Sequence, residues 1–94
     1  MPFAYCQIVL FIPGCSSLKE KRSVLARLLA QLRKRNVSVI ESGRQDHWQQ
    51  AELALAMVSA DRSLLERQIN ELHKLVDEDF MRVQLTDFNY EIYL

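Results

Sequence analysis

The chain has 94 residues, of which 49% are hydrophobic and 26% are charged, and its formal net charge is zero. This length provides one domain with one modest core, and the composition excludes an intrinsically disordered or low-complexity protein. Zero net charge argues against a protein that holds nucleic acid by overall positive charge alone.

A first strand is predicted at Ala4–Ile12, which is rich in Ile, Val, Phe and Tyr and is apolar at odd and even positions, as in a central strand. Pro13 and Gly14 end it. The apolar run is too short to span a bilayer, and neither a preceding basic segment nor a following cleavage-like site marks a targeting peptide. We therefore expect no membrane association.

The two cysteines are predicted to be free thiols. Cys6 lies early in the first strand and Cys15 just beyond its end. An extended chain that rises about 3.3 Å per residue would separate them by roughly 25 Å, which is too far for a disulfide. Free thiols are typical of a reducing compartment, so we expect a cytoplasmic protein.

A first helix is predicted to begin at Ser17, because Ser17–Glu20 reads as a capping box. An apolar stripe at helical spacing then continues to about Arg35 and would be buried. Lys21 falls on this stripe, so its stem would lie among apolar side chains while its ammonium group reaches solvent beside the loop after the second strand. The stripe comprises Leu18, Leu25, Leu28, Leu29 and Leu32.

The next two strands are predicted at 37–41 and 51–59, joined by a polar connection at 42–50. The alternation in 51–59 assigns its apolar side chains to two faces. Leu53, Leu55 and Met57 share one face, and Ala54, Ala56 and Val58 share the other.

A second helix is predicted at 61–77 and a last strand at 82–94. The apolar positions of this strand change parity along its length, so a β-bulge or break is expected near Asp87. The residues that the second helix would bury are Leu65, Ile69, Leu72 and Val76.

The order β-α-β-β-α-β predicts an α+β fold of the ferredoxin-like type, a four-stranded antiparallel sheet with two helices on one face. Residues 1–94 would form a single domain of this type. The topology brings the segments 16–22, 44–50 and 77–80 to the same end of the sheet, and this end is the predicted site. Residues 1–50 carry eight Lys and Arg against three Asp and Glu, and residues 51–94 carry four against nine. This asymmetry either marks a basic binding face or lets the two halves attract each other.

Three motifs resemble the YlxP-like family of small bacterial proteins: Ile-Pro-Gly followed by Ser17–Arg22, then Gln45–Gln49, then Val58–Arg62. The similarity covers nearly the whole chain and implies a ferredoxin-like domain with no established activity. Genes of the family often lie beside genes for translation initiation and ribosome maturation, which implies a link to RNA by association. Glu20 stands where Asp is common in the family, and His47 where an apolar residue is common.

The sequence shows no catalytic or metal-binding constellation. His47 and His73 are far apart, and neither His-x-x-x-His nor Cys-x-x-Cys occurs. Cys15 has no evident base beside it. The fold is also similar to that of acylphosphatases, but Gly14–Ser17 does not supply their Gly-rich loop with an arginine inside it. We therefore expect no metal, no cofactor and no enzymatic activity.

The sheet face without helices is predicted to contact a protein, and a two-fold homodimer is expected. RNA-recognition motifs stack bases on aromatic residues of both central strands, but here only the first strand offers them, so base stacking on this face is disfavoured. The change of parity in the last strand suggests further contacts beyond the sheet. The predicted interface residues are Tyr5, Val9, Phe11, Ala54, Ala56, Val58, Phe88, Tyr90 and Ile92.

An anion, such as a phosphate group, is predicted to bind where the first helix begins. Cations are unfavourable at this end of the helix dipole, whereas a phosphate would meet free backbone N–H groups and cations together. The alternative is that Asp46, Asp77, Glu78 or Asp79 neutralises the cations. Trp48 is either a lid over the core or a platform for base stacking. The candidate residues are Lys19, Lys21, Arg22, Arg44 and Trp48.

These expectations favour a non-enzymatic cytoplasmic module that acts on RNA or on a ribosome-associated protein through the basic end of its sheet. The alternative is a regulatory domain that binds a small anionic metabolite and assembles through its sheet face. The two hypotheses differ in ligand, because RNA binding should strengthen steeply as salt is lowered.

Overall fold

The computed structural model describes residues 1–94 except for the side chain of Asp79. Its elements follow one another in the predicted order, with bounds that differ from the predicted ones by a few residues. They are β1 (Phe3–Phe11), α1 (Leu18–Arg33), β2 (Ser38–Gly43), β3 (Gln50–Val58), α2 (Arg62–Lys74), the π-helical turn η1 (Leu75–Asp79) and β4 (Gln84–Tyr93).

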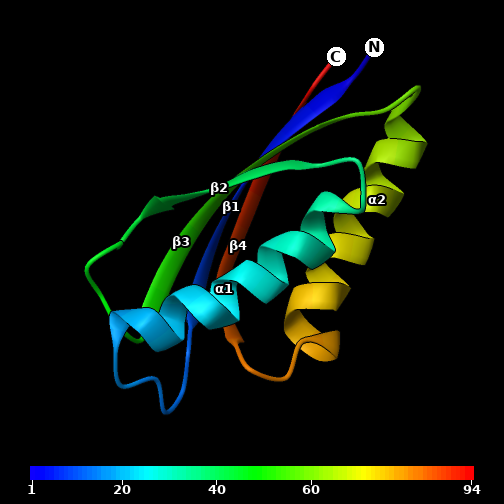
Figure 1. The fold of residues 1–94 in the computed structure, drawn as a ribbon. Coiled ribbons are helices and arrows are strands. Elements are labelled where there is room, and N and C mark those ends of the chain that lie inside the picture. The colour runs from blue at the N-terminus through cyan, green and yellow to red at the C-terminus, as the bar shows by residue number, and fades with distance from the viewer.

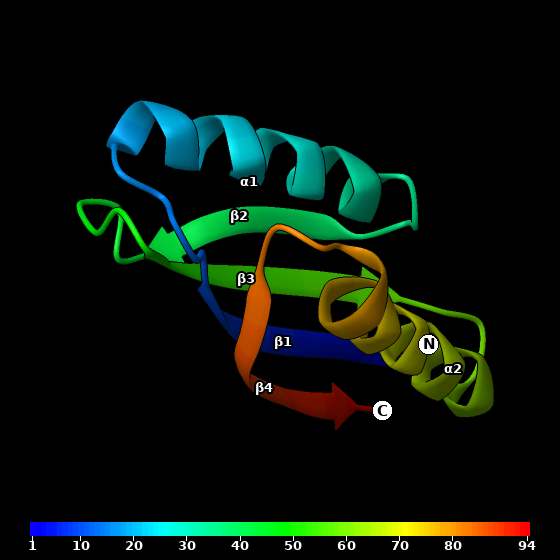
Figure 2. The ribbon, with the colours of Figure 1, turned by 90° about the horizontal axis from the view of Figure 1, so that it is seen from below.

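The four strands form one antiparallel sheet in the order β2-β3-β1-β4. Figure 2 shows this order, with α1 beside β2 and α2 beside β1 and β4. In Figure 1 the sheet is seen nearly edge-on, and both helices lie on the same side of it. The predicted ferredoxin-like fold is confirmed.

Side chains cap both helices. The Ser17 hydroxyl accepts a hydrogen bond from the Glu20 backbone N–H at 3.1 Å, and the Asp61 carboxylate accepts one from the Leu64 N–H at 2.8 Å. Such a cap contributes about 1 kcal/mol to helix stability. The predicted start of the first helix is therefore confirmed, and α1 ends at Arg33, two residues before the predicted end.

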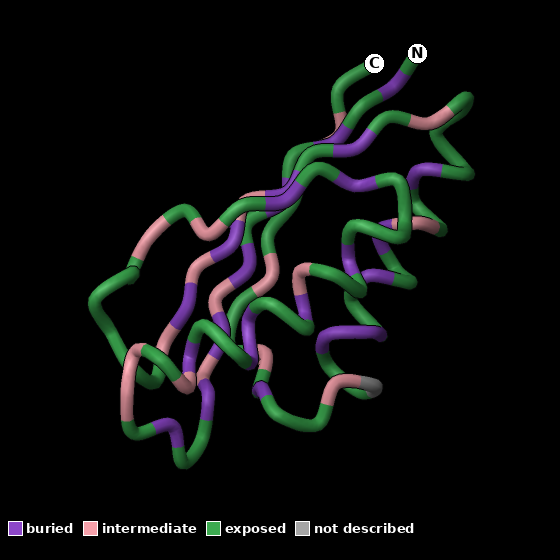
Figure 3. The backbone as a smooth tube through the Cα atoms, viewed as in Figure 1, coloured by how far each residue is buried: buried purple, intermediate pink, exposed green. Residues whose placement is uncertain are grey.

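The core lies between the sheet and the two helices. Buried and exposed residues alternate along the strands (Figure 3), so each strand turns one set of side chains toward the helices. The predicted faces of β3 and of the second helix are confirmed, whereas Leu18 and Leu29 of the predicted α1 stripe are only half-buried. The core residues of these elements include Ile8, Leu10, Leu28, Leu32, Leu53, Leu55, Leu65, Ile69, Leu72 and Val76.

The predicted irregularity near Asp87 is present, because the register of β1 and β4 shifts between Val9 and Leu10. The Thr86 hydroxyl donates a hydrogen bond to the Val9 carbonyl at 2.8 Å across this bulge. Beyond it, the apolar residues of β4 oppose the inward-facing residues of β1 and so lie on the helix side of the sheet. These residues are Phe88, Tyr90 and Ile92.

This placement divides the predicted interface residues between two faces of the sheet. The Phe88 ring contacts the His73 ring of α2 edge-on, with centroids 4.9 Å apart. Phe88 and Ile92 are half-buried against the core. What lies beyond β4 on this side is therefore α2, and these residues are no part of the face without helices.

Both cysteines are free and buried. Burial raises the pKa of the Cys6 thiol to about 11, since an apolar environment disfavours the thiolate. Within the part of the chain that the structure describes, no helix is both long enough and apolar enough to cross a membrane.

Candidate functional site

Two of the three segments predicted to share one end of the sheet, 16–22 and 44–50, meet there (Figure 1). The Ile12 backbone N–H donates to the Gln49 carbonyl at 2.8 Å, and the Gln49 side-chain amide donates to the Cys15 carbonyl at 3.3 Å. These bonds join the loop after β1 to the β2–β3 loop. Arg82, just before β4, reaches the same end through the Glu20 carboxylate at 3.4 Å.

Lys21 is part of the interior rather than of an exposed anion site. Only 2% of its surface is exposed. Its Nζ donates to the Arg44 carbonyl at 2.7 Å and lies 3.0 Å from Glu41 Oε2. The predicted direction, toward the loop that carries Arg44, is confirmed, but the ammonium group does not reach solvent. Its partner is Glu41, which was not among the predicted acidic partners.

The start of α1 already holds a carboxylate of the chain itself. Glu20 Oε2 accepts hydrogen bonds from the Ser16 backbone N–H and from the Ser16 hydroxyl, both at 3.2 Å. In a capping box the acid accepts from the backbone N–H of the capping residue, which here is Ser17, whereas Glu20 reaches Ser16, one residue earlier. A carboxylate of the chain nevertheless lies beside the position predicted for a phosphate, and the candidate site is displaced toward the β2–β3 loop.

Arg44 has a strained backbone conformation and a solvent-exposed side chain. Its φ is 59°, in the left-handed region that costs a residue with a Cβ about 1 kcal/mol. The Arg44 carbonyl accepts from the His47 N–H at 3.0 Å and from Lys21, so two donors fix this conformation. The guanidinium group donates to Gln50 Oε1 at 2.8 Å. Lys21 therefore supports the loop that presents Arg44.

Trp48 lies on the surface of the same loop, with 53% of its area exposed. A lid over the core would be buried, so this exposure favours the stacking platform of the two predicted roles. Trp48 borders a shallow hollow of about 710 Å³ at the end of β1, where an aromatic ring could stack on it while Arg44 contacts a phosphate. The hollow is lined by Phe11, Asp46, His47, Trp48, Gln49 and Gln50.

The remaining predicted cations, Lys19 and Arg22, are exposed in the first turns of α1. The side chains that the structure describes include no group of three or more His, Cys, Asp or Glu that could hold a metal ion. The candidate site thus combines exposed cations with one exposed indole ring.

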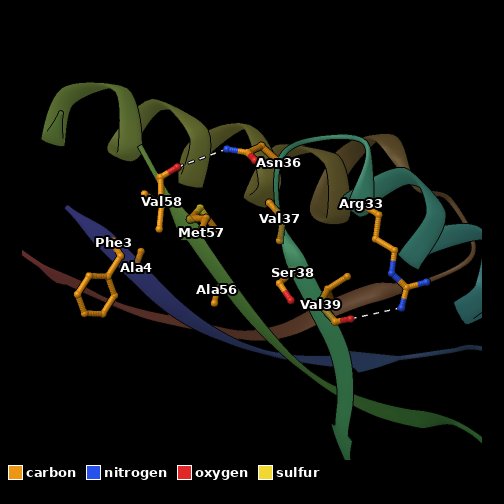
Figure 4. A pocket seen from close by; sticks show the side chains of 10 residues that line it. All are labelled: Phe3, Ala4, Arg33, Asn36, Val37, Ser38, Val39, Ala56, Met57 and Val58. Atoms are coloured by element: carbon orange, nitrogen blue, oxygen red, sulfur yellow. Dashed lines mark hydrogen bonds between the residues drawn. The ribbon is translucent and has the colours of Figure 1, made fainter. Parts of the chain in front are cut away.

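The opposite end of the sheet carries a second open cleft, of about 820 Å³, in which two polar side chains bond to backbone carbonyls of the chain (Figure 4). The Arg33 guanidinium donates to the Val39 carbonyl at 3.4 Å, and the Asn36 amide donates to the Val58 carbonyl at 3.4 Å. Arg33 thereby covers part of the β2 edge, which would otherwise offer free backbone groups to another strand. This cation stabilises the fold.

The face without helices includes large apolar residues that the sequence analysis missed. Phe3 is 46% exposed, Ile40 60% and Tyr93 42%. The alternation of residues 37–41, which buries Val39, was the signal that could have assigned Ile40 to the other face. The Phe3 and Tyr93 rings stack with centroids 5.0 Å apart.

Comparison with known sequences gives two matches. The model of a family described as "Protein of unknown function (DUF503)" matches residues 3–90. The uncharacterized protein YlxP of Bacillus subtilis (strain 168) is 38% identical over 76 residues, which cover 80% of each chain. The family predicted from the sequence motifs is therefore shown.

Comparison with solved structures shows the fold alone. A ferredoxin-like protein of the dabb family from Mesorhizobium loti has a TM-score of 0.55 at 17% identity, covering 100% of this chain and 97% of the other. The de novo designed protein Foldit4 has a TM-score of 0.54 at 9% identity, covering 100% and 98%. One fold thus serves a natural and a designed sequence, and the function has to be argued from the side chains.

Proposed function

Because the chain belongs to the DUF503 family of proteins of unknown function, we infer its role from its own residues and propose a non-enzymatic cytoplasmic module that binds single-stranded RNA. The binding surface is the end of the sheet that carries Lys19, Arg22, Arg44 and Trp48. The observation that supports this proposal is the half-exposed indole of Trp48 on the same loop as Arg44.

The two kinds of side chain supply the two parts of RNA recognition. A base stacked on an aromatic side chain contributes about 1–3 kcal/mol, whatever its sequence. Arg44 can bind the adjacent phosphate with two parallel hydrogen bonds once it exchanges Gln50 for the ligand. Asp46, which borders the hollow, disfavours a phosphate there, so the base occupies the hollow and the phosphate lies toward Arg44.

Single strands are favoured over duplexes for a geometric reason. Bases within a helical stem are stacked on each other and cannot reach an indole ring, whereas unpaired bases can be splayed onto it. Lys19 and Arg22 would contact flanking phosphates, which adds affinity and salt dependence without sequence preference. A ribosome-associated partner with unpaired RNA would present this chemistry.

The single Trp of the chain reports on its own site. Single-stranded RNA is expected to quench Trp48 fluorescence, and more strongly at low salt than at physiological salt. In polarisation measurements with labelled RNA, Trp48→Ala should weaken binding by about 5- to 150-fold, the equivalent of one stacked base.

A matched pair of charge variants tests the cations. Lys19→Gln with Arg22→Gln should lower affinity and reduce the slope of log affinity against log salt by about one for each lost phosphate contact. Arg27→Gln with Lys34→Gln removes the same charge from an exposed position of α1 and from its C-cap, and should change neither. Equal effects of the two pairs would contradict a local site.

Free nucleotides test the alternative that the ligand is a small anionic metabolite. If nucleoside monophosphates saturate the protein and RNA does not compete, the ligand is a small anionic metabolite and the RNA proposal is wrong. Failure of both ligands to change Trp48 fluorescence or polarisation would remove this end of the sheet as a binding site.

A further inference from the structure

The uncovered sheet face presents large and small side chains on neighbouring strands. On this face β1 carries Phe3, Tyr5 and Val9, whereas its neighbour β3 carries Val58, Ala56 and the half-buried Ala54. Figure 4 shows Phe3 and Ala56 projecting away from the helices. A depression of about 200 Å³ lies over the two alanines, with Tyr5 on one side of it and Ile40 on the other.

The charges of this face disfavour RNA as its partner. The four strands contain no Lys or Arg, while Glu52, Asp87 and Glu91 are on the uncovered face according to the strand register. Nucleic acid would meet carboxylates rather than cations there. A partner of this face is therefore a protein surface rather than nucleic acid, and the exposed side chains of Phe3, Tyr5, Ile40 and Val58 form the kind of apolar patch that marks a protein interaction site.

We propose that the partner is a second copy of this chain, related by a two-fold axis that runs parallel to the strands between β1 and β3. Such an axis places β1 of each copy over β3 of the other, at matching positions along the strands. Tyr5 and Ala56 are direct neighbours in the sheet, so the axis places Tyr5 of each copy over Ala56 of the other. Each Tyr5 ring then enters the depression over the alanines of the other copy.

The other simple two-fold arrangement fits the same face poorly. An axis perpendicular to the strands would lay β1 on β1 and β3 on β3, so large residues would meet large ones and alanines would face each other across a gap. It would also bring the β4 carboxylates of Asp87 and Glu91 together, and like charges in contact are unfavourable. The parallel axis keeps the two β4 strands on opposite sides of the dimer.

The area of the face suffices for a dimer. A strand of nine residues spans about 30 Å, and four strands spaced about 4.8 Å apart give a width of about 19 Å. The projected face is thus about 570 Å² in each copy, or about 1,140 Å² for both, and the relief of the side chains increases the total buried area toward the roughly 1,200–2,000 Å² of stable complexes.

The dimer would also affect the candidate RNA site, although the dimer proposal does not depend on RNA binding. Since equivalent positions of the strands are superposed, the β2–β3 loops of both copies lie at the same end of the dimer. Two copies of Trp48 and Arg44 would then face the same direction. A single strand of RNA could contact both and gain affinity from linked binding.

The oligomeric state tests the partner. Light scattering at tens of micromolar should give twice the chain mass of 11.0 kDa. Ala56→Glu should raise the dimer dissociation constant on the order of 100-fold, because its carboxylate would be buried against Tyr5 without a cation. The same substitution at the exposed Ala30 of α1 should leave it unchanged. A monomeric wild-type protein, or equal effects of the two variants, would overturn the proposal.

The orientation is tested separately with a mixed sample of isotope-labelled and unlabelled protein. Isotope-filtered nuclear Overhauser spectra should show contacts between the Tyr5 ring of one copy and the Ala54 and Ala56 methyl groups of the other. Contacts between the Ala54 methyl groups of the two copies would establish the perpendicular axis and overturn the arrangement. Absence of any intermolecular contact from Tyr5 in a confirmed dimer would assign the interface to another surface.

Discussion

Lys21 and Arg44 lie at the same end of the molecule and touch each other, yet their environments are opposite. Lys21 is buried beneath α1 with Glu41, and Arg44 projects from the β2–β3 loop with a hydrogen bond to a neutral amide. The buried cation holds the backbone of the exposed one through the Arg44 carbonyl. Availability of a cation to a ligand thus depends on its partners and burial, and a structural cation can position a functional one.

The largest effect is expected from breaking the buried pair. Lys21→Met should lower the free energy of unfolding by about 2–4 kcal/mol, because it leaves the charge of Glu41 without a partner. Only 25% of the Glu41 side chain is exposed to solvent. Chemical denaturation measures this value. Adding Glu41→Met should recover most of the loss, and Arg22→Met, one residue away, should change stability by less than about 0.5 kcal/mol. A double variant as unstable as Lys21→Met would show that packing, rather than the unpaired charge, caused the loss.

Cys6, another buried ionisable group, is expected to make stability fall at high pH. Its pKa is about 11 when folded and near 9.0 when exposed, so the folded state holds more protons in this range. The stability that the raised pKa contributes is complete below pH 9 and is lost as the pH rises toward 11, by at most about 1.4 kcal/mol for each pH unit. Urea unfolding at pH 8, 9 and 10 should show a steeper decline for the wild type than for Cys6→Ala. Parallel curves would mean that the thiol does not titrate differently on folding.

A smaller effect on stability is expected for substitutions of Arg44, the exposed cation. Arg44→Gly should be more stable than Arg44→Ala by about 1 kcal/mol, since only glycine adopts the left-handed conformation without strain. Both variants lose the guanidinium group, so both should bind single-stranded RNA equally weakly. Thermal melting and RNA polarisation measured on the same samples separate the two effects. Equal melting temperatures would show that the loop relaxes when the side chain is removed.

The smallest effect is expected for the exposed cations of α1. Lys19→Gln with Arg22→Gln should change the free energy of unfolding by less than about 0.5 kcal/mol, because both side chains are in solvent. This outcome contrasts with that for Lys21, which lies two residues from Lys19 and next to Arg22 in the sequence. A loss above about 1 kcal/mol in denaturation would mean that these cations support the fold as Lys21 does.

Features that depend on neighbouring residues could be predicted from the amino-acid sequence. The Ser17 cap, the two faces of β3 and the break near Asp87 follow from spacing over a few positions, and the order of elements then restricts the topology to very few choices. The resemblance of three motifs also identified the family. The end of the sheet where the candidate site lies could be predicted because topology alone places its loops together.

Which side chains are paired and which are exposed follows from contacts that form only in the folded chain. Glu41 is twenty residues from Lys21, and no local pattern joins them. Phe88 was predicted to contact something beyond the sheet, but only the position of α2 shows that this is His73. The alternation of residues 37–41 could place Ile40 on the face opposite Val39, but only the packing of the helices shows that this face is the uncovered one. Periodicity within one segment assigns side chains to faces, whereas their partners come from contacts between distant segments.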